Sequence, residues 1–158
     1  LIENTNLTAH HKESLIGKNG IINWNKTKKL TDQIIKVFDV RTPNNEVSAG
    51  SLSGGNLQKF VIGREILQNP SVLIVNQPTW GVDAAAANSI HQAILDLAST
   101  GSAIILISQD LDELIEVSDS FAAINAGRIS KKIDTGGLTI DEIGLMIGGT
   151  GKHWNHDN

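Results

Sequence analysis

The chain has no cysteine among its 158 residues, and aromatic residues make up only 4% of it. The absence of cysteine excludes a disulfide framework, a thiolate metal site and a cysteine nucleophile, and it fits a reducing compartment. With a net charge of −4, the sequence lacks the excess of Lys and Arg that marks a nucleic-acid surface, so we expect no nucleic-acid partner. It also lacks a run of 18 or more apolar residues that would predict a membrane-spanning helix.

The N-terminal residues resemble the middle of a longer protein rather than its start. The sequence does not begin with Met, and its first residues lack the charged-then-apolar pattern of a signal peptide. We therefore expect the chain to be a fragment. Its length and its hydrophobic fraction of 40% are sufficient for one domain with a core.

Before Pro70 the sequence predicts helices and loops but no strand. The first residues are polar, rich in Asn and Lys and weakly periodic, whereas apolar residues recur at helical spacing further on. The predicted elements are irregular structure with one short helix over 1–30, a helix over 31–38 with Thr31 as its N-cap, a loop over 39–49 and an amphipathic helix over 56–68. We therefore expect a mostly helical lobe over residues 1–69.

After Pro70 short apolar runs alternate with helical patterns, which predicts an α/β fold with a parallel sheet. The continuous apolar runs 72–75 and 103–107 are typical of strands buried on both faces. The other predicted elements are a helix capped by Asp83, an acidic helix over 110–117, a hairpin turning at 125–127, a helix capped by Thr139 and a disordered tail over 148–158. The expected domain limits are 70–134 for this core and 135–158 for the last helix and tail.

The segment from Leu52 to Gly55 combines three features of an anion site. Two adjacent glycines allow close backbone approach, Ser53 offers a hydroxyl, and the start of the following helix supplies N–H groups and the positive end of its dipole. The alternative interpretation is a glycine-rich turn capped by Ser53. These residues alone leave both interpretations open.

The wider context favours the first interpretation. LSGGNLQK, from Leu52 to Lys59, strongly resembles the signature motif of ATP-binding cassette (ABC) proteins, in the form typical of sugar and nucleoside importers. Similar motifs occur in the family's order and spacing: FDVRTP at 38–43, REILQNP at 64–70, a Walker B-like VLIVNQPT at 72–79, a D-loop WGVD at 80–83, a switch segment ISQDLDE at 107–113 and a terminal hairpin SDSFAAINAGRI at 118–129. The resemblance extends over about residues 30–150.

This resemblance implies the parallel sheet of a RecA-like P-loop NTPase with an ABC helical subdomain, from which the Walker A half is absent. A Walker A loop requires G-x-x-x-x-G-K-[ST], and neither Gly17-Lys18 nor Gly151-Lys152 belongs to such a sequence. We therefore expect weak or no ATP binding by the chain alone. We also expect an exposed apolar edge and face on its sheet, and hence marginal stability or self-association.

The resemblance also shows where the nucleotide site departs from the family. The Walker B strand of the family ends in an Asp that helps to hold Mg²⁺ and a Glu that polarises water, but this sequence has Asn76 and Gln77 there. An amide cannot act as a general base, and loss of such a base typically costs about 10²–10⁴ in rate. Asn76 weakens the hold on Mg²⁺, and Gln109 replaces the switch histidine without a cationic form. We expect this half's own site to be poor or inactive in hydrolysis.

Cassettes of this family pair head to tail, and each ATP lies between the Walker A loop of one and the signature of the other. The residues expected to contact ATP phosphate on a partner cassette are Leu52, Ser53, Gly54, Gly55, Asn56 and Gln58. Asp83 would lie at the seam between the cassettes, and it serves equally well as a helix N-cap. The implied cofactors are ATP and Mg²⁺, both of which require the partner cassette or the missing N-terminal half.

The resemblance implies a parent protein that is an ABC-type ATPase, peripheral on the cytoplasmic face of the membrane. Its expected partners are the other cassette, or the N-terminal half of the same protein, and membrane permease subunits for nucleoside or simple-sugar import. The chain by itself is expected to be inactive. Two alternatives stay open: a non-catalytic structural or regulatory cassette remnant, and a non-transport cassette ATPase.

Overall fold

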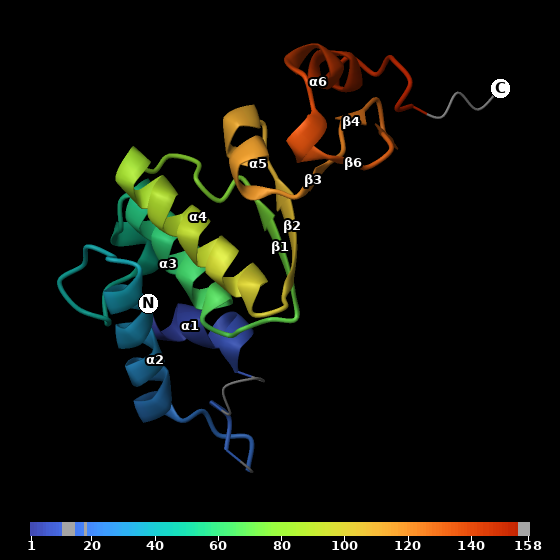
Figure 1. Cartoon of the computed structure of the whole chain (residues 1–158). Helices are drawn as coiled ribbons and strands as arrows, with labels where there is room; N and C mark the ends of the chain where they lie inside the picture. Colours follow the sequence, from blue (N-terminus) through green and yellow to red (C-terminus); the bar gives the residue numbers. More distant parts are fainter. Residues whose placement is uncertain (11–14, 18, 155–158) are drawn as a thin grey trace. The chain divides into compact units, whose positions relative to one another are not determined.

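The computed structural model describes residues 1–10, 15–17 and 19–154 (Figure 1). The chain divides into two compact units, Leu1–Ile107 and Ser108–Asn158. This division falls at a different place from the domain limits expected from the motifs (1–69, 70–134 and 135–158), which stay a prediction. None of the described helices is long and apolar enough to cross a bilayer.

The first unit combines helices with a pair of parallel strands (Figure 1). In chain order its elements are α1 (Ile2–Ala9), α2 (Trp24–Val37), a 3-10 turn (Ala49–Ser51), α3 (Gly54–Ile66), β1 (Val72–Asn76), α4 (Ala84–Ser99) and β2 (Ala103–Ile107). Val72 lies beside Ala103 and Asn76 beside Ile107, so the two strands end together. The strand–helix–strand order with parallel pairing confirms the α/β arrangement expected from the sequence.

The core of this unit lies between the helices and one face of the strand pair. Its buried side chains include Leu30, Ile34, Phe38, Phe60, Ile62, Ile66, Leu73, Val75, Ile90, Ile94 and Leu97. Successive strand residues point to opposite faces, so Leu73 and Val75 enter the core while Val72 and Ile74 do not. α4 packs against both α3 and β2.

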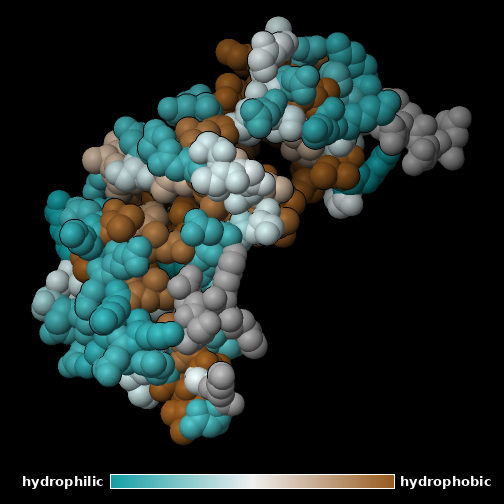
Figure 2. All heavy atoms as spheres, turned by 60° about the horizontal axis from the view of Figure 1, so that its bottom comes forward, coloured by the Kyte–Doolittle hydropathy of each residue, from teal (hydrophilic) through white to brown (hydrophobic). Residues whose placement is uncertain are grey.

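The outer face of the strand pair remains exposed. Val72 is 57% exposed, Ile74 64%, Ile105 50% and Ile107 43%. The prediction that these strands are buried on both faces was therefore wrong, because the described residues cover one face only. The expectation of an exposed apolar face is confirmed, and apolar side chains are visible at the surface among polar ones (Figure 2).

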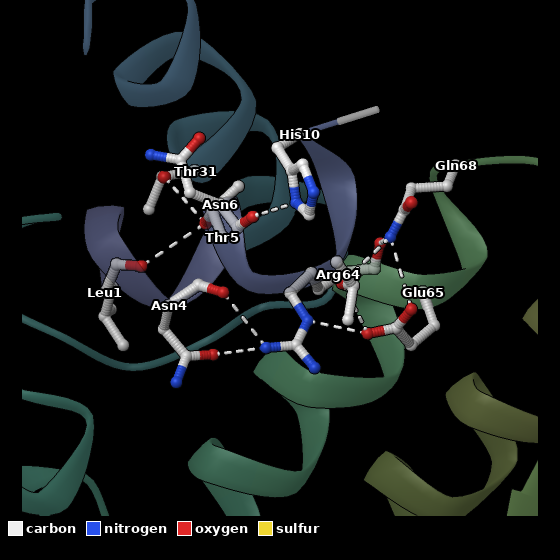
Figure 3. Close-up of polar contacts among 10 residues, drawn as sticks. Leu1, Asn4, Thr5, Asn6, His10, Thr31, Arg64, Glu65 and Gln68 are labelled. Carbon is white, nitrogen blue, oxygen red and sulfur yellow. Dashed lines mark hydrogen bonds and ion pairs between the residues drawn. The ribbon is translucent and has the colours of Figure 1, made fainter. Parts of the chain in front are cut away.

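The N-terminal region is more helical than its composition predicts. α2 begins at Trp24, and Asn23 caps it by accepting a backbone hydrogen bond. Thr31 was expected to be the N-cap, but it lies inside the helix and is fully buried. Its Oγ1 lies 2.9 Å from that of Thr5 on α1 (Figure 3). Burial of paired hydroxyls explains the error, because apolar spacing does not reveal threonines that face a core.

A polar network joins α1 to α3 (Figure 3). Nη1 of Arg64 donates to the backbone and side-chain oxygens of Asn4 at 3.1 and 2.5 Å, and its Nε donates to Oε1 of Glu65 at 2.7 Å. Nε2 of Gln68 donates to Oγ1 of Thr8 at 3.2 Å. The side chain of Arg64 is only 11% exposed, so its contacts are shielded from water. The sequence REILQNP therefore contributes to helix packing.

The described part of the second unit, residues 108–154, holds α5, four short strands and α6. The bounds are α5 (Leu111–Val117), β3 (Ser120–Phe121), β4 (Ile124–Asn125), β5 (Arg128–Ile129), β6 (Ile133–Asp134), a 3-10 turn (Thr135–Gly137) and α6 (Ile140–Ile147). β4 and β5 pair antiparallel around Ala126 and Gly127, whose φ values are 47° and 76°. The predicted hairpin is confirmed, and so is the Thr139 cap, which forms a capping box with Glu142.

The tail expected to be disordered is ordered as far as Trp154. This indole is 5% exposed, and its Nε1 donates to the carbonyl of Met146 at 3.1 Å. The backbone N–H of Lys131 donates to the carbonyl of His153 at 2.8 Å. The prediction was wrong because a lone tryptophan after glycines forms no sequence period. Residues 155–158 lie outside the described residues.

Candidate functional site

The glycine pair lies in the first turn of α3, which begins at Gly54 rather than at the predicted residue 56. Ser53 is the extended N-cap, and its carbonyl accepts the N–H of Leu57 at 2.9 Å. The N–H groups of Gly54, Gly55 and the next residue have no acceptor within the helix, as at every helix start. Ser53 and Gly54 are exposed. This helix start therefore presents N–H groups and a positive dipole end at the surface.

Two neighbours hold this segment in place. Nδ2 of Asn56 donates to Oγ of Ser53 at 2.9 Å, and its Oδ1 accepts the backbone N–H of Arg41 at 2.8 Å. Leu52 is half-buried and packs against the core of the first unit. Asn56 and Leu52 thus make protein contacts at positions where the sequence predicts contacts to phosphate.

Gln58 lies one turn further along α3 and reaches a different segment. Its Nε2 donates to the carbonyls of Gln77 at 3.0 Å and Pro78 at 2.9 Å. The sequence places Gln58 with the phosphate contacts, but in the structure its donor group is engaged by the loop after β1. No sequence signal reveals these partners, because backbone carbonyls are present in every loop.

Asn76 and Gln77 lie at the carboxyl end of β1, the end at which open parallel sheets bind ligands. Asn76 is exposed, and Gln77 is half-buried with a left-handed φ of 51°. The N–H of Gln77 donates to the carbonyl of Ile107 at 2.8 Å. Among the described residues, no group of three or more acidic or histidine side chains is placed to hold a metal ion. A neutral amide pair does not make a Mg²⁺ site by itself.

Asp83 and Gln109 lie at helix starts in different units. The carboxylate of Asp83 caps α4 by accepting the N–H of Ala86 at 2.8 Å, which confirms the N-cap interpretation. Gln109 is exposed and directly precedes Asp110, the N-cap of α5. The seam position of Asp83 and the switch role of Gln109 stay predictions.

The chain is similar to curated ATP-binding proteins of importers. It is 41% identical over 148 residues to the nucleoside import ATP-binding protein NupA of Lactococcus lactis subsp. cremoris, and 36% identical over 148 residues to the guanosine import ATP-binding protein NupO of Bacillus subtilis. It is 38% identical over 126 residues to the galactose/methyl galactoside import ATP-binding protein MglA of Escherichia coli K12. The chain belongs to the ABC transporter ATP-binding proteins, and the relatives that it matches here are described as import proteins for nucleosides, guanosine and galactose or methyl galactoside.

The chain spans less than a third of the length of these three relatives. The matches cover 93%, 94% and 80% of the chain but only 29%, 29% and 25% of NupA, NupO and MglA. A solved dimer of the ATP-binding cassette MJ0796 bound to ADP and Pi shares the fold, with a TM-score of 0.70 at 19% identity, over 87% of this chain and 57% of that one. No family model matches the chain.

Proposed function

We propose that this chain is part of an importer ATPase, that it contributes its signature segment, residues 52–56, to ATP bound on a partner cassette, and that it so helps to power nucleoside or simple-sugar uptake. The exposed start of α3, with Ser53 beside the first N–H groups, carries the proposal. The relatives described as nucleoside and galactoside import proteins support the substrate class.

The local geometry suits a terminal phosphate. Backbone N–H groups at a helix start bind phosphate oxygens, and the helix dipole favours their negative charge. Oγ of Ser53 accepts from Asn56, so its own proton remains available to donate outward. A Cβ on Gly55 would lie 3.3 Å from the carbonyl oxygen of Gly81, so a side chain there would require the neighbouring loop to shift by a few tenths of an ångström.

The chain's own Walker B position has a different role in this proposal. Asn76, Gln77 and Gln109 carry neutral amides where the family has an acid pair and a histidine. Amides donate and accept hydrogen bonds but do not take a proton from water at neutral pH. ATP held at this site, with Mg²⁺ ligated by groups outside this chain, would join the cassettes without turnover, while hydrolysis proceeds at the partner's site.

The test is the ATPase activity of the complete protein assembled with its permease subunits. Ser53→Arg fills the space above the start of α3, and we expect kcat to fall by at least about 100-fold, as when a transition-state donor is lost. Gln77→Ala removes an amide that is not a base, so we expect little change. Ser89→Arg is the matched control, since Ser89 is exposed on α4 and lies outside the signature segment in the sequence.

The outcomes separate the two parts of the proposal. Activity retained in Ser53→Arg would overturn the role of the signature. Comparable losses in Ser53→Arg and Gln77→Ala would overturn the asymmetry between the two sites.

A further inference from the structure

We propose that Gln58 is a positioning residue that fixes the loop 77–82 against the start of α3. The inference rests on the proposed function, because it links the segment offered to a partner's nucleotide with the segment that belongs to the chain's own site. The side-chain amide of Gln58 has two hydrogens, and two carbonyls accept from it, those of Gln77 at 3.0 Å and Pro78 at 2.9 Å.

The loop 77–82 has the features of a segment that needs such support. Gln77 has a left-handed backbone, which a residue with a Cβ adopts at a cost, and its carbonyl also accepts the N–H of Trp80 at 3.1 Å. Pro78 is fully buried, whereas Trp80 is 73% exposed. The loop is thus anchored at its start and open to solvent at its tip. The side-chain amide of Gln58, on α3, donates its hydrogen bonds to Gln77 and Pro78 at the start of the loop.

A second contact brings the same two segments together. A Cβ on Gly55 would lie 3.3 Å from the carbonyl oxygen of Gly81 and 3.6 Å from Cα of Val82. The first turn of α3 therefore touches the far end of the loop, and Gln58, one turn later, holds its beginning. Gly55 permits the close approach at the far end of the loop, and Gln58 fixes the loop at its beginning.

This arrangement gives Gln58 a function different from phosphate contact. Residues 52–56 serve the nucleotide of the partner in the proposed function, and Gln77 occupies the chain's own site. The two segments are joined because Gln58 lies one turn after the signature on α3 and its amide donates to the carbonyl of Gln77. A displaced loop would shift the signature segment, so loss of the amide should lower turnover while leaving ATP binding elsewhere intact.

The experiment compares two variants of the complete ATP-binding protein assembled with its permease subunits. Gln58→Leu removes both donors, and Gln58→Glu keeps the shape but presents oxygens to the carbonyls. Two neutral hydrogen bonds together account for about a tenfold change in an opening equilibrium. We expect about tenfold faster hydrogen exchange at the Trp80 amide in both variants, and about a tenfold fall in kcat with an unchanged KM for ATP.

Gln92→Leu is the matched control. Gln92 is exposed on α4, and its Nε2 donates to Oδ1 of Asp96 at 2.7 Å, so this variant loses an amide donor without touching the loop. Exchange at Trp80 and kcat should both stay as in the wild type. Because Gln58→Glu preserves packing, its loss of turnover identifies the donors rather than the volume of the side chain.

The result that overturns the inference is unchanged exchange at Trp80 in both Gln58 variants, or faster exchange with unchanged kcat. If Ser53→Arg abolishes ATPase activity in the same preparations, such a result overturns only the role of Gln58 and leaves the proposed function standing. Conversely, activity retained in Ser53→Arg overturns the proposed function by itself, whatever the Gln58 variants do.

Discussion

Gly63 in the middle of α3 offers the sharpest test of how the helices of the first unit pack. The residue is buried, and a Cβ placed on it would lie 2.4 Å from Cδ2, 2.7 Å from Cγ and 2.9 Å from Cε2 of Phe38. Carbon atoms pack best at about 3.5–4.0 Å, so the overlap is close to 1 Å. Phe38 is 6% exposed and belongs to the core, so its ring has little room to move.

The free energy of unfolding of Gly63→Ala combines two opposed terms. Alanine in a helix interior is more favourable than glycine by about 1 kcal/mol. An extra methyl in a packed core costs about 1–3 kcal/mol, and contact with three ring atoms places this site at the upper end. We expect a net destabilisation of about 1–2 kcal/mol. Gly144→Ala in α6 is the control, because that Cβ would meet nothing within 4 Å and should stabilise its helix.

Denaturant-dependent hydrogen exchange suits this comparison, since it follows α3 and α6 separately in a chain with two units. A double-mutant cycle adds Phe38→Leu, which makes room for the new methyl. We expect an interaction free energy of about 1 kcal/mol or more between the two changes. An unfolding free energy that rises in Gly63→Ala, or strictly additive effects in the cycle, would refute the packing argument.

Two further predictions concern helix ends. Asp83→Ala should lower the free energy of unfolding of α4 by about 1 kcal/mol, and Asp83→Asn should retain most of it; equal values for both in urea unfolding would exclude the cap. The hydrogen bond from Lys152 lowers the pKa of Glu142 below its ordinary 4.5, so the stability this pair contributes is present above pH 4.5 and is lost as the pH falls through the lowered pKa. NMR titration of Glu142 should show a higher pKa in Lys152→Met, and an unchanged titration would contradict the pairing.

Elements marked by local chemistry were predictable from the sequence. Asp83 and Thr139 each precede an apolar period and accept a backbone N–H in the structure. The apolar runs that became β1 and β2 were long enough to identify as strands, and their parallel pairing followed from the helix between them. The apolar runs did not reveal that only one face of the strand pair is buried, because that depends on whether a second layer of structure covers the other face.

The features that sequence did not reveal depend on partners distant in the chain. Thr5 and Thr31 are buried because their hydroxyls meet across two helices, so polar residues occupy core positions. Trp154 is buried against the carbonyl of Met146, without any periodic signal. Gln58 matched a family motif, but the motif did not disclose which way its amide points. Side-chain direction was the information missing in each case.

At the exposed start of α3, the motif predicted which residues lie together, whereas the structure was needed to show their contacts. Ser53 and the glycines were predictable as a group because the motif specifies their order. The hydrogen bond between Ser53 and Asn56, and the packing of Leu52 against the core, arise only once the helix begins at Gly54. Together with Gln58, three of the six residues predicted to contact phosphate, Leu52, Asn56 and Gln58, thus make contacts within the protein.

The backbone at the end of β1 is held on both sides of Gln77: its N–H donates to the carbonyl of Ile107, and its carbonyl accepts from the side-chain amide of Gln58 and the N–H of Trp80. Amide and carboxylate side chains have the same shape, so acids at positions 76 and 77 would inherit this scaffold without rearrangement. Under the proposed function, an idle nucleotide site and an active one can therefore share one architecture. They would differ by a single terminal atom in each side chain.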